Sequence, residues 1–321
     1  RNDIADILVK DGWEPLVVHH SEEKGTLDKI KMLFLTRNDW SKIYHKIPEN
    51  SELLIQYPLA MYPKVSTVAI PFLKKIKRKN VKLIFLIHDL DSLRGVYKNG
   101  EREFLSTADV IIAHNPVMVD YLKQNGYSDK EIRSLNIFDY LIQDTVACRK
   151  EGEKTEVVIA GNLKREKAGY VYRLNEVEGE IQFRLYGPNY DGETQGGNVK
   201  YCGQYKPEEL PEKLEGGFGL VWDGNGLNGC TGVFGEYMKY NNPHKTSLYL
   251  ASGLPVIIWE KAAMAKYIEK NNLGIAVSEI NEIPLKLKKM SKEDYKIMKK
   301  NVEVVGKQLC QGKMLLTVLG K

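Results

Sequence analysis

The stretch from Gly216 to Trp259 constrains the fold of this 321-residue chain more than any other part of it. It opens with an apolar run at 218–222 (FGLVW) and closes with another at 255–259 (PVIIW), and both runs are short and bulky enough to predict buried strands. A loop with five glycines follows the first run, and a helical pattern precedes the second. A strand, a helix and a strand in this order predict a βαβ unit, and therefore a parallel sheet.

The start of the predicted helix has the chemistry of an anion site. We expect Asn242 to cap the helix and Pro243 to occupy its first turn, with His244 and Lys245 following. Unpaired N–H groups and partial positive charge gather at a helix N-terminus, and Lys245 adds a full charge. The pattern also fits an ordinary crossover with a surface lysine, but the neighbouring glycines favour a phosphate or diphosphate site.

Strands alternate with helices along the rest of the chain, which predicts parallel sheets covered on both faces. The other expected strands are 16–19, 51–57, 81–87, 109–113 and 132–137 in the first half, and 157–160, 181–186, 199–202 and 273–277 in the second. This α/β pattern predicts two Rossmann-like domains.

The polar run at 147–156 (ACRKEGEKTE) is the predicted linker between these domains. It gives a first domain at 1–150 and a second at 151–302, followed by a helix at 303–321 whose packing partner the pattern does not identify. Because the chain opens on a helical pattern at 2–11, we expect the first strand of the first domain to be missing.

Composition and charge exclude several classes of protein. No apolar run approaches the roughly 20 residues that span a bilayer. The net charge of 47 − 42 = +5 is mild, and its densest cluster is KKIKRK at 74–79. This cluster is either a solvated helix end or a surface attracted to anionic lipid. Without aromatic residues between the basic ones, we expect no nucleic-acid partner. Four scattered cysteines without CxxC spacing favour reduced thiols in a cytoplasmic protein.

Two residues that follow the strand at 81–87 are candidates for catalysis. In open α/β sheets, ligands bind beyond the carboxyl ends of the strands. Asp89, beside His88, has the chemistry of a general base toward a sugar hydroxyl. The alternative is that Asp89 caps the next turn and His88 is a packed histidine, and the pattern does not decide between the two.

Strand ends in the second half carry glycine together with polar or cationic residues. After 157–160 come Asn162, Lys164 and Arg165, an amide and two cations that suit a diphosphate. Tyr205 follows 199–202, where it can stack on a nucleobase, and Asp223 follows 218–222. No single one of these motifs is specific, and their convergence at strand ends carries the prediction.

Other chemistries lack their signatures. The sequence has no GxxxxGK[ST], GxGxxG, HExxH or GxSxG motif. Its histidines and carboxylates show no metal-ligand spacing, so we expect neither a metal nor another cofactor.

Four segments together resemble a known family: GFGLVWDG, NNPHKTSLYLASGLPVIIW, GNLKR and FLIHDLDSLR. They are similar to bacterial glycosyltransferases with two Rossmann-like domains facing each other across a cleft, the GT-B fold. This family includes β-1,6-galactofuranosyltransferases of polysaccharide assembly and the glucosyltransferase 3 that extends GlcNAc on serine-rich adhesins. The resemblance extends from residue 1 to about 274 and is strongest at 216–260.

The resemblance implies that the second domain holds a UDP-sugar donor and the first domain binds the acceptor. Carried over by position, Arg165, Tyr205 and Lys245 bind the donor, with Asn162, Asp223 and Asn242 as weaker candidates. The loop at 225–240 is longer than in the glucosyltransferase branch, which favours the galactofuranosyltransferase branch.

The function predicted is therefore that of an inverting, metal-independent hexosyltransferase, with galactofuranose favoured and glucose next. Its acceptor would be a sugar hydroxyl of a growing glycan, on a glycoprotein or a lipid-linked saccharide. A lipid-linked acceptor would bring a cytoplasmic enzyme to the inner face of the membrane, and the family includes oligomers. The main alternative is a non-catalytic partner that binds a nucleotide sugar or a glycan and assists another transferase. A sugar-nucleotide epimerase with the same architecture is a third interpretation.

Overall fold

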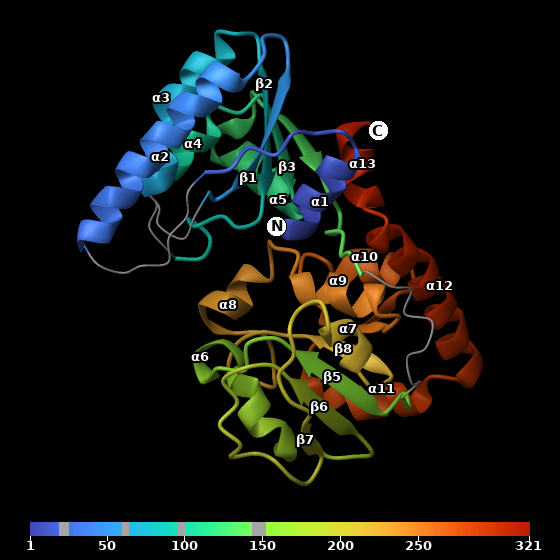
Figure 1. Cartoon of the computed structure of the whole chain (residues 1–321). Coiled ribbons are helices and arrows are strands. Elements are labelled where there is room, and N and C mark those ends of the chain that lie inside the picture. Colours follow the sequence, from blue (N-terminus) through green and yellow to red (C-terminus); the bar gives the residue numbers. More distant parts are fainter. Residues whose placement is uncertain (19–25, 60–63, 96–99, 143–151) are drawn as a thin grey trace. The chain divides into compact units, whose positions relative to one another are not determined.

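Two parallel sheets, each with its own hydrophobic core, organise the described part of the chain (Figure 1). The structure is a computed structural model that describes residues 1–18, 26–59, 64–95, 100–142 and 152–321. These residues divide into a first unit, Arg1–Leu135, and a second unit, Asn136–Lys321.

The first unit contains a four-stranded parallel sheet in the order β1-β2-β3-β4. The strands and helices are α1 (Asn2–Lys10), α2 (Thr26–Lys46), β1 (Glu52–Tyr57), α3 (Lys64–Lys77), β2 (Lys82–Ile87), α4 (Glu101–Leu105), β3 (Val110–Ala113), α5 (Pro116–Leu122), the π-helical turn η1 (Lys123–Tyr127) and β4 (Glu131–Ser134). Four of the five strands predicted in this half are confirmed, since each overlaps an observed strand. The strand predicted at 16–19 is wrong as far as the described residues reach, because residues 16–18 form no strand. Strand β2 is central and almost wholly buried, which explains its continuous apolar sequence.

The second unit contains a six-stranded parallel sheet in the order β10-β9-β8-β5-β6-β7. Its elements are β5 (Glu156–Ala160), α6 (Arg165–Ala168), η2 (Gly169–Glu176), β6 (Gln182–Tyr186), β7 (Val199–Tyr201), α7 (Leu210–Lys213), β8 (Phe218–Val221), α8 (Gly232–Tyr237), α9 (His244–Ala251), β9 (Val256–Trp259), α10 (Ala265–Lys270), β10 (Gly274–Val277), η3 (Ile280–Glu282), α11 (Ile283–Lys289), α12 (Lys292–Cys310) and α13 (Lys313–Leu319). The strand order reverses between β5 and β8, so this pair is the topological switch point.

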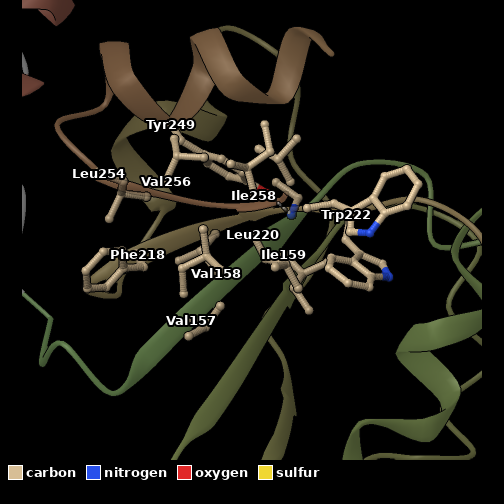
Figure 2. Packing of buried hydrophobic residues seen from close by; sticks show 14 of the residues in the cluster. Val157, Val158, Ile159, Phe218, Leu220, Trp222, Tyr249, Leu254, Val256 and Ile258 are labelled. Carbon is tan, nitrogen blue, oxygen red and sulfur yellow. Dashed lines mark hydrogen bonds between the residues drawn. The ribbon is translucent and has the colours of Figure 1, made fainter. Parts of the chain in front are cut away.

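Helix α9 packs tightly against this switch point, as Figure 2 shows. A Cβ atom on Gly219 of β8 would lie 2.2 Å from the Tyr249 ring, so only glycine lets the ring lie on the strand. The backbone N–H of Ala160, at the end of β5, donates to the Tyr249 hydroxyl over 2.7 Å. The core of the second unit therefore holds in place α9, the helix whose N-terminus is the predicted anion site.

The C-terminal helices also belong to the second unit, although the sequence pattern identified no packing partner for residues 303–321. Helix α12 already starts at Lys292 and packs on α9, where a Cβ atom on Gly306 would lie 2.6 Å from the Leu250 carbonyl oxygen. Gly312, in the left-handed conformation with φ 72°, separates α12 from α13. The prediction of a single helix at 303–321 is therefore wrong, and α9 is the packing partner of α12.

The boundary between the units lies between Leu135 and Asn136, whereas the sequence predicted it at 150/151. Residues 136–142 pack on the second unit: the Ser247 hydroxyl donates to the Phe138 carbonyl over 2.7 Å. The Asp139 carboxylate accepts from the backbone N–H groups of Met314 and Leu315 over 3.0 and 2.8 Å. Half of the predicted linker at 147–156 lies outside the described residues.

Candidate functional site

Lys245 lies at the carboxyl end of β8, where its ammonium group is held by two acceptors. Its Nζ donates to the Trp222 carbonyl over 2.6 Å and to Asp223 Oδ1 over 2.7 Å. The two side chains are only 16% and 11% exposed. An ammonium group has three N–H donors, so two of them orient it and the third is available to a ligand. The structure thus brings together two of the predicted donor residues, Lys245 and Asp223.

The cap of α9 differs from the prediction. The helix begins at His244 with Pro243 as its N-cap, so Asn242 is not the capping residue. The Asn242 side chain is buried and its amide donates to the Asn136 carbonyl over 3.0 Å, which anchors the segment that precedes the site. His244 is exposed, and its ring lies 4.5 Å from that of Phe138. The cap prediction for Asn242 is wrong because a contact distant in sequence uses its side chain.

The loop after β5 presents the other predicted phosphate ligands. The Asn162 carboxamide oxygen accepts from Lys164 N and from Asn189 Nδ2 over 3.1 and 2.9 Å, which closes the loop. Lys164 is the N-cap of α6 and its ammonium group is exposed, 3.5 Å from Glu166. These contacts shape the loop and leave the Lys164 ammonium group at the surface.

Arg165 is held by three partners. Its guanidinium group pairs with Asp191 over 2.8 Å and with Glu193, and it stacks 3.9 Å from the centre of the Tyr172 ring. Since its side chain is about half exposed, these ion pairs are screened by water. An incoming diphosphate would therefore compete with two carboxylates for this arginine.

Backbone hydrogen bonds join α6 and η2, which follow β5, to the loop after β8. Gly224 N donates to the Lys167 carbonyl over 2.8 Å, and Tyr170 N donates to the Gly224 carbonyl over 3.2 Å. These bonds tie α6, which carries Arg165, to the loop that holds the Lys245 ammonium group through Trp222 and Asp223.

Tyr205 follows β7, the strand at one edge of the six-stranded sheet. Its hydroxyl donates to the Cys202 carbonyl over 3.1 Å, and its ring centre is 6.4 Å from that of Tyr186. The ring is partly exposed and remains available for stacking, but it is three strands away from β8.

A hollow of about 470 Å³ opens at the carboxyl ends of β8, β9 and β10. Its lining includes Cys230, Glu236, Lys239, Trp259 and Glu260, and burial raises the pKa of the Cys230 thiol. None of the predicted donor residues lines it. The hollow is therefore a separate feature of the same sheet edge.

In the first unit, His88 and Asp89 follow β2 as predicted, and both already have partners. His88 is buried, and its Nε2 lies 2.8 Å from Gln56 Oε1. Asp89 pairs with Arg94 over 3.0 Å. These contacts fit the alternative interpretation as well as the catalytic one.

Asp91, two residues further on, has a different environment that the sequence analysis missed. The residue is 8% exposed and its carboxylate lies beside buried Glu101. Glu101 Oε2 accepts from the Asp91 and Ser92 backbone N–H groups and from the Tyr57 hydroxyl. Burial, and then repulsion from Glu101, raise the pKa of Asp91. The only sequence signal for Asp91 is its place at the same strand end.

Two further classes of feature were searched for among the described residues. No group of three or more His, Cys, Asp or Glu side chains in those ranges is arranged to hold a metal ion. The described helices include none with the length and apolar character needed to cross a bilayer.

The two α/β units with parallel sheets have the GT-B fold of glycosyltransferases. Residues 1–137 match the N-terminal domain of the glucosyltransferase 3-like family, and residues 157–321 match its C-terminal domain. The chain therefore belongs to the glucosyltransferase 3-like family, whose members transfer hexosyl groups.

Relatives and solved structures agree with this assignment. The chain is 38% identical over 276 residues to β-1,6-galactofuranosyltransferase WbbI of Escherichia coli (strain K12), covering 84% of this chain and 79% of WbbI. It is 28% identical over 236 residues to glucosyltransferase 3 of Streptococcus parasanguinis, covering 72% of this chain and 66% of that one. The fold is similar to the lipopolysaccharide outer core galactosyltransferase WaaB in its apo form, with a TM-score of 0.53, 13% identity, and coverage of 91% and 81%.

Proposed function

We propose that this protein is an inverting, metal-independent glycosyltransferase that moves a hexosyl group from a UDP-sugar to a sugar hydroxyl of a growing glycan. Galactofuranose is the favoured sugar and glucose the next. The 38% identity to a β-1,6-galactofuranosyltransferase, against 28% to a glucosyltransferase, supports this order.

The observation that carries the proposal is the Lys245 ammonium group at the start of α9, beside the switch point. When UDP leaves, negative charge develops on the β-phosphate. Lys245 and the N-terminal end of the α9 dipole would stabilise that charge without a metal ion. Arg165 contributes if the diphosphate displaces Asp191 or Glu193 from it.

The acceptor oxygen attacks the anomeric carbon while the bond from that carbon to the β-phosphate oxygen breaks, and a carboxylate takes the acceptor proton. Asp89 is one candidate for this base and His88 another. Asp91 is a third, since a raised pKa makes a carboxylate a stronger base. A single displacement of this kind inverts the anomeric configuration.

A transfer assay with UDP-galactofuranose and UDP-glucose, each with and without EDTA, tests the proposal. We expect transfer from one of the two donors to be unaffected by EDTA, with inverted configuration in the product by NMR. Loss of transfer in EDTA that is restored by a divalent cation would refute the metal-independent mechanism, and retained configuration would refute the single displacement.

Lys245→Met, compared with the matched control Lys300→Met on exposed α12, tests the site itself. We expect UDP affinity in calorimetry to fall about 10- to 100-fold for Lys245→Met alone, the range of a hydrogen bond to a charged group. Unchanged affinity would remove Lys245 from the diphosphate site.

The second candidate, a non-catalytic partner of another transferase, is favoured by one observation. The Arg165 guanidinium group is engaged by two carboxylates, so it is not preset to hold a phosphate. Such a partner would bind UDP or a glycan, yet show no donor turnover with any acceptor added. Turnover by the isolated chain excludes this function.

A further inference from the structure

Helix α2 carries large apolar side chains on its outward face. Phe34 is 70% exposed and Ile30, one turn earlier, is 49% exposed. Met32 and Thr36, each two positions from Phe34, are buried. Two positions correspond to about 200° around a helix, so Phe34 points away from the core that its neighbours enter. Packing among the described residues of the first unit therefore does not account for Phe34 and Ile30.

Basic residues surround this apolar face. Between positions 30 and 46, Lys31, Arg37 and Lys42 are exposed. The single carboxylate in that span is Asp39, which is buried. The exposed surface of this part of α2 is therefore apolar and cationic, without an acidic side chain of its own.

The basic run at 74–79 on the neighbouring helix α3 is largely committed to other contacts. Lys74 pairs with Glu103 over 3.2 Å, and Lys77 pairs with Asp109 over 2.6 Å. The Lys79 ammonium group donates to the carbonyls of Tyr44 and Ile47. Lys75 and Arg78 of the run stay exposed, and they add to the cationic surface of α2, which runs beside α3 (Figure 1).

We propose that the outward face of α2, from Ile30 to Lys42, docks on the surface of a bilayer that contains anionic phospholipid. Phe34 and Ile30 enter the boundary between headgroups and acyl chains, as the apolar face of an interfacial helix does. Lys31, Arg37 and Lys42 contact lipid phosphates. Charge selects this occupant over a second copy of the chain, because a symmetric contact would bring the same cationic face against itself.

Co-sedimentation with vesicles of phosphatidylcholine, alone or with 30% phosphatidylglycerol (about one charge in three lipids), tests the docking surface. We expect binding to the anionic vesicles that weakens as salt rises, because exposed charges are screened. Phe34→Ser should weaken it about ten-fold, from the lost apolar burial. The double variant Lys31→Ala/Arg37→Ala should weaken it about thirty-fold, since each basic residue near such a surface contributes roughly a five-fold factor.

Matched controls come from helix α12 of the second unit. Val304 is also an exposed apolar residue, 54% exposed, and Lys296 and Lys300 are exposed lysines. Val304→Ser and Lys296→Ala/Lys300→Ala should leave vesicle binding within two-fold of the original chain, roughly the limit for surface changes away from a site. Circular dichroism verifies that each variant is folded.

Three results would overturn the inference. The first is no binding to anionic vesicles, and the second is binding that Phe34→Ser does not weaken. The third is that Phe34→Ser lowers the mass measured by sedimentation equilibrium without lipid, which would assign the face to contact between copies.

Discussion

The pair formed by Lys245 and Asp223 yields a test that separates the effect of Lys245 on stability from its effect on ligand binding. Lys245→Met leaves the largely buried Asp223 carboxylate without its cation. Removing one partner of a buried pair costs about 3–5 kcal/mol of unfolding free energy, because the remaining charge is uncompensated. The loss should be near the lower end, about 3 kcal/mol, since both side chains retain some contact with water.

Adding Asp223→Asn to Lys245→Met removes the stranded charge. We expect the double variant to recover most of the lost stability, because a neutral amide replaces the carboxylate at nearly the same volume. UDP affinity should not recover, since the ammonium group is still missing. The fall should remain about 10- to 100-fold.

Calorimetric unfolding with and without UDP measures both quantities, and the transition that UDP raises identifies the second unit. Two results would contradict the reasoning. If the double variant binds UDP as tightly as the original chain, Lys245 has no role at the diphosphate. If the double variant is no more stable than Lys245→Met, the two side chains do not form a coupled pair.

Three further predictions concern other contacts. The pKa of Asp91 is raised in the folded chain, so the folded chain keeps this proton at pH values where the unfolded chain has lost it, and stability falls as pH rises through that window. Asp91→Asn should therefore raise the melting temperature of the first unit at pH 7.5, with no gain near pH 3.5 (about the ordinary pKa of an aspartate). An equal gain at both pH values would contradict this reasoning. Gly306→Ala should destabilise the second unit by about 1–3 kcal/mol in urea unfolding, because the added Cβ clashes with the Leu250 carbonyl. A gain in unfolding free energy, as expected from helix propensity alone, would show that α12 and α9 separate without cost. Asp139→Ala should lower the unfolding free energy by about 2–3 kcal/mol, because the buried carboxylate accepts hydrogen bonds from two backbone N–H groups of α13. A change below about 0.5 kcal/mol in the same assay would show that water replaces the carboxylate.

The sheets were predictable from sequence because their strands are short apolar runs separated by glycine and polar residues. Val81–Ile87 is nearly continuous apolar sequence, and β2 is buried on both faces as such a run requires. The position of α9 between β8 and β9 followed in the same way. The apolar pattern along the chain was sufficient to predict an element wherever the apolar residues are the ones that become buried.

Contacts distant in sequence account for what the pattern missed. Asn242 has the composition of a cap, but its amide bonds to a carbonyl at position 136 instead. Arg165 looked like a free phosphate ligand, yet Asp191 and Glu193 reach it from a loop more than twenty residues later. The burial of Asp91 beside Glu101 likewise depends on a helix ten residues further along. No local rule predicts such pairings, because they are set by the packing of whole elements.

Helix α9 also shows why the candidate site is rigid. Its residues from Thr246 to Ala251 are all buried, so the helix cannot shift without breaking the core around it. Gly219 and Gly306 allow the sheet and α12 to approach it from two sides. The ammonium group of Lys245 is thereby fixed at the end of β8 before any ligand arrives, and a preorganised charge stabilises a developing anion better than a mobile one. It follows that substitutions at Gly219 or Gly306, which contact no ligand in this arrangement, should weaken UDP binding through the position of Lys245.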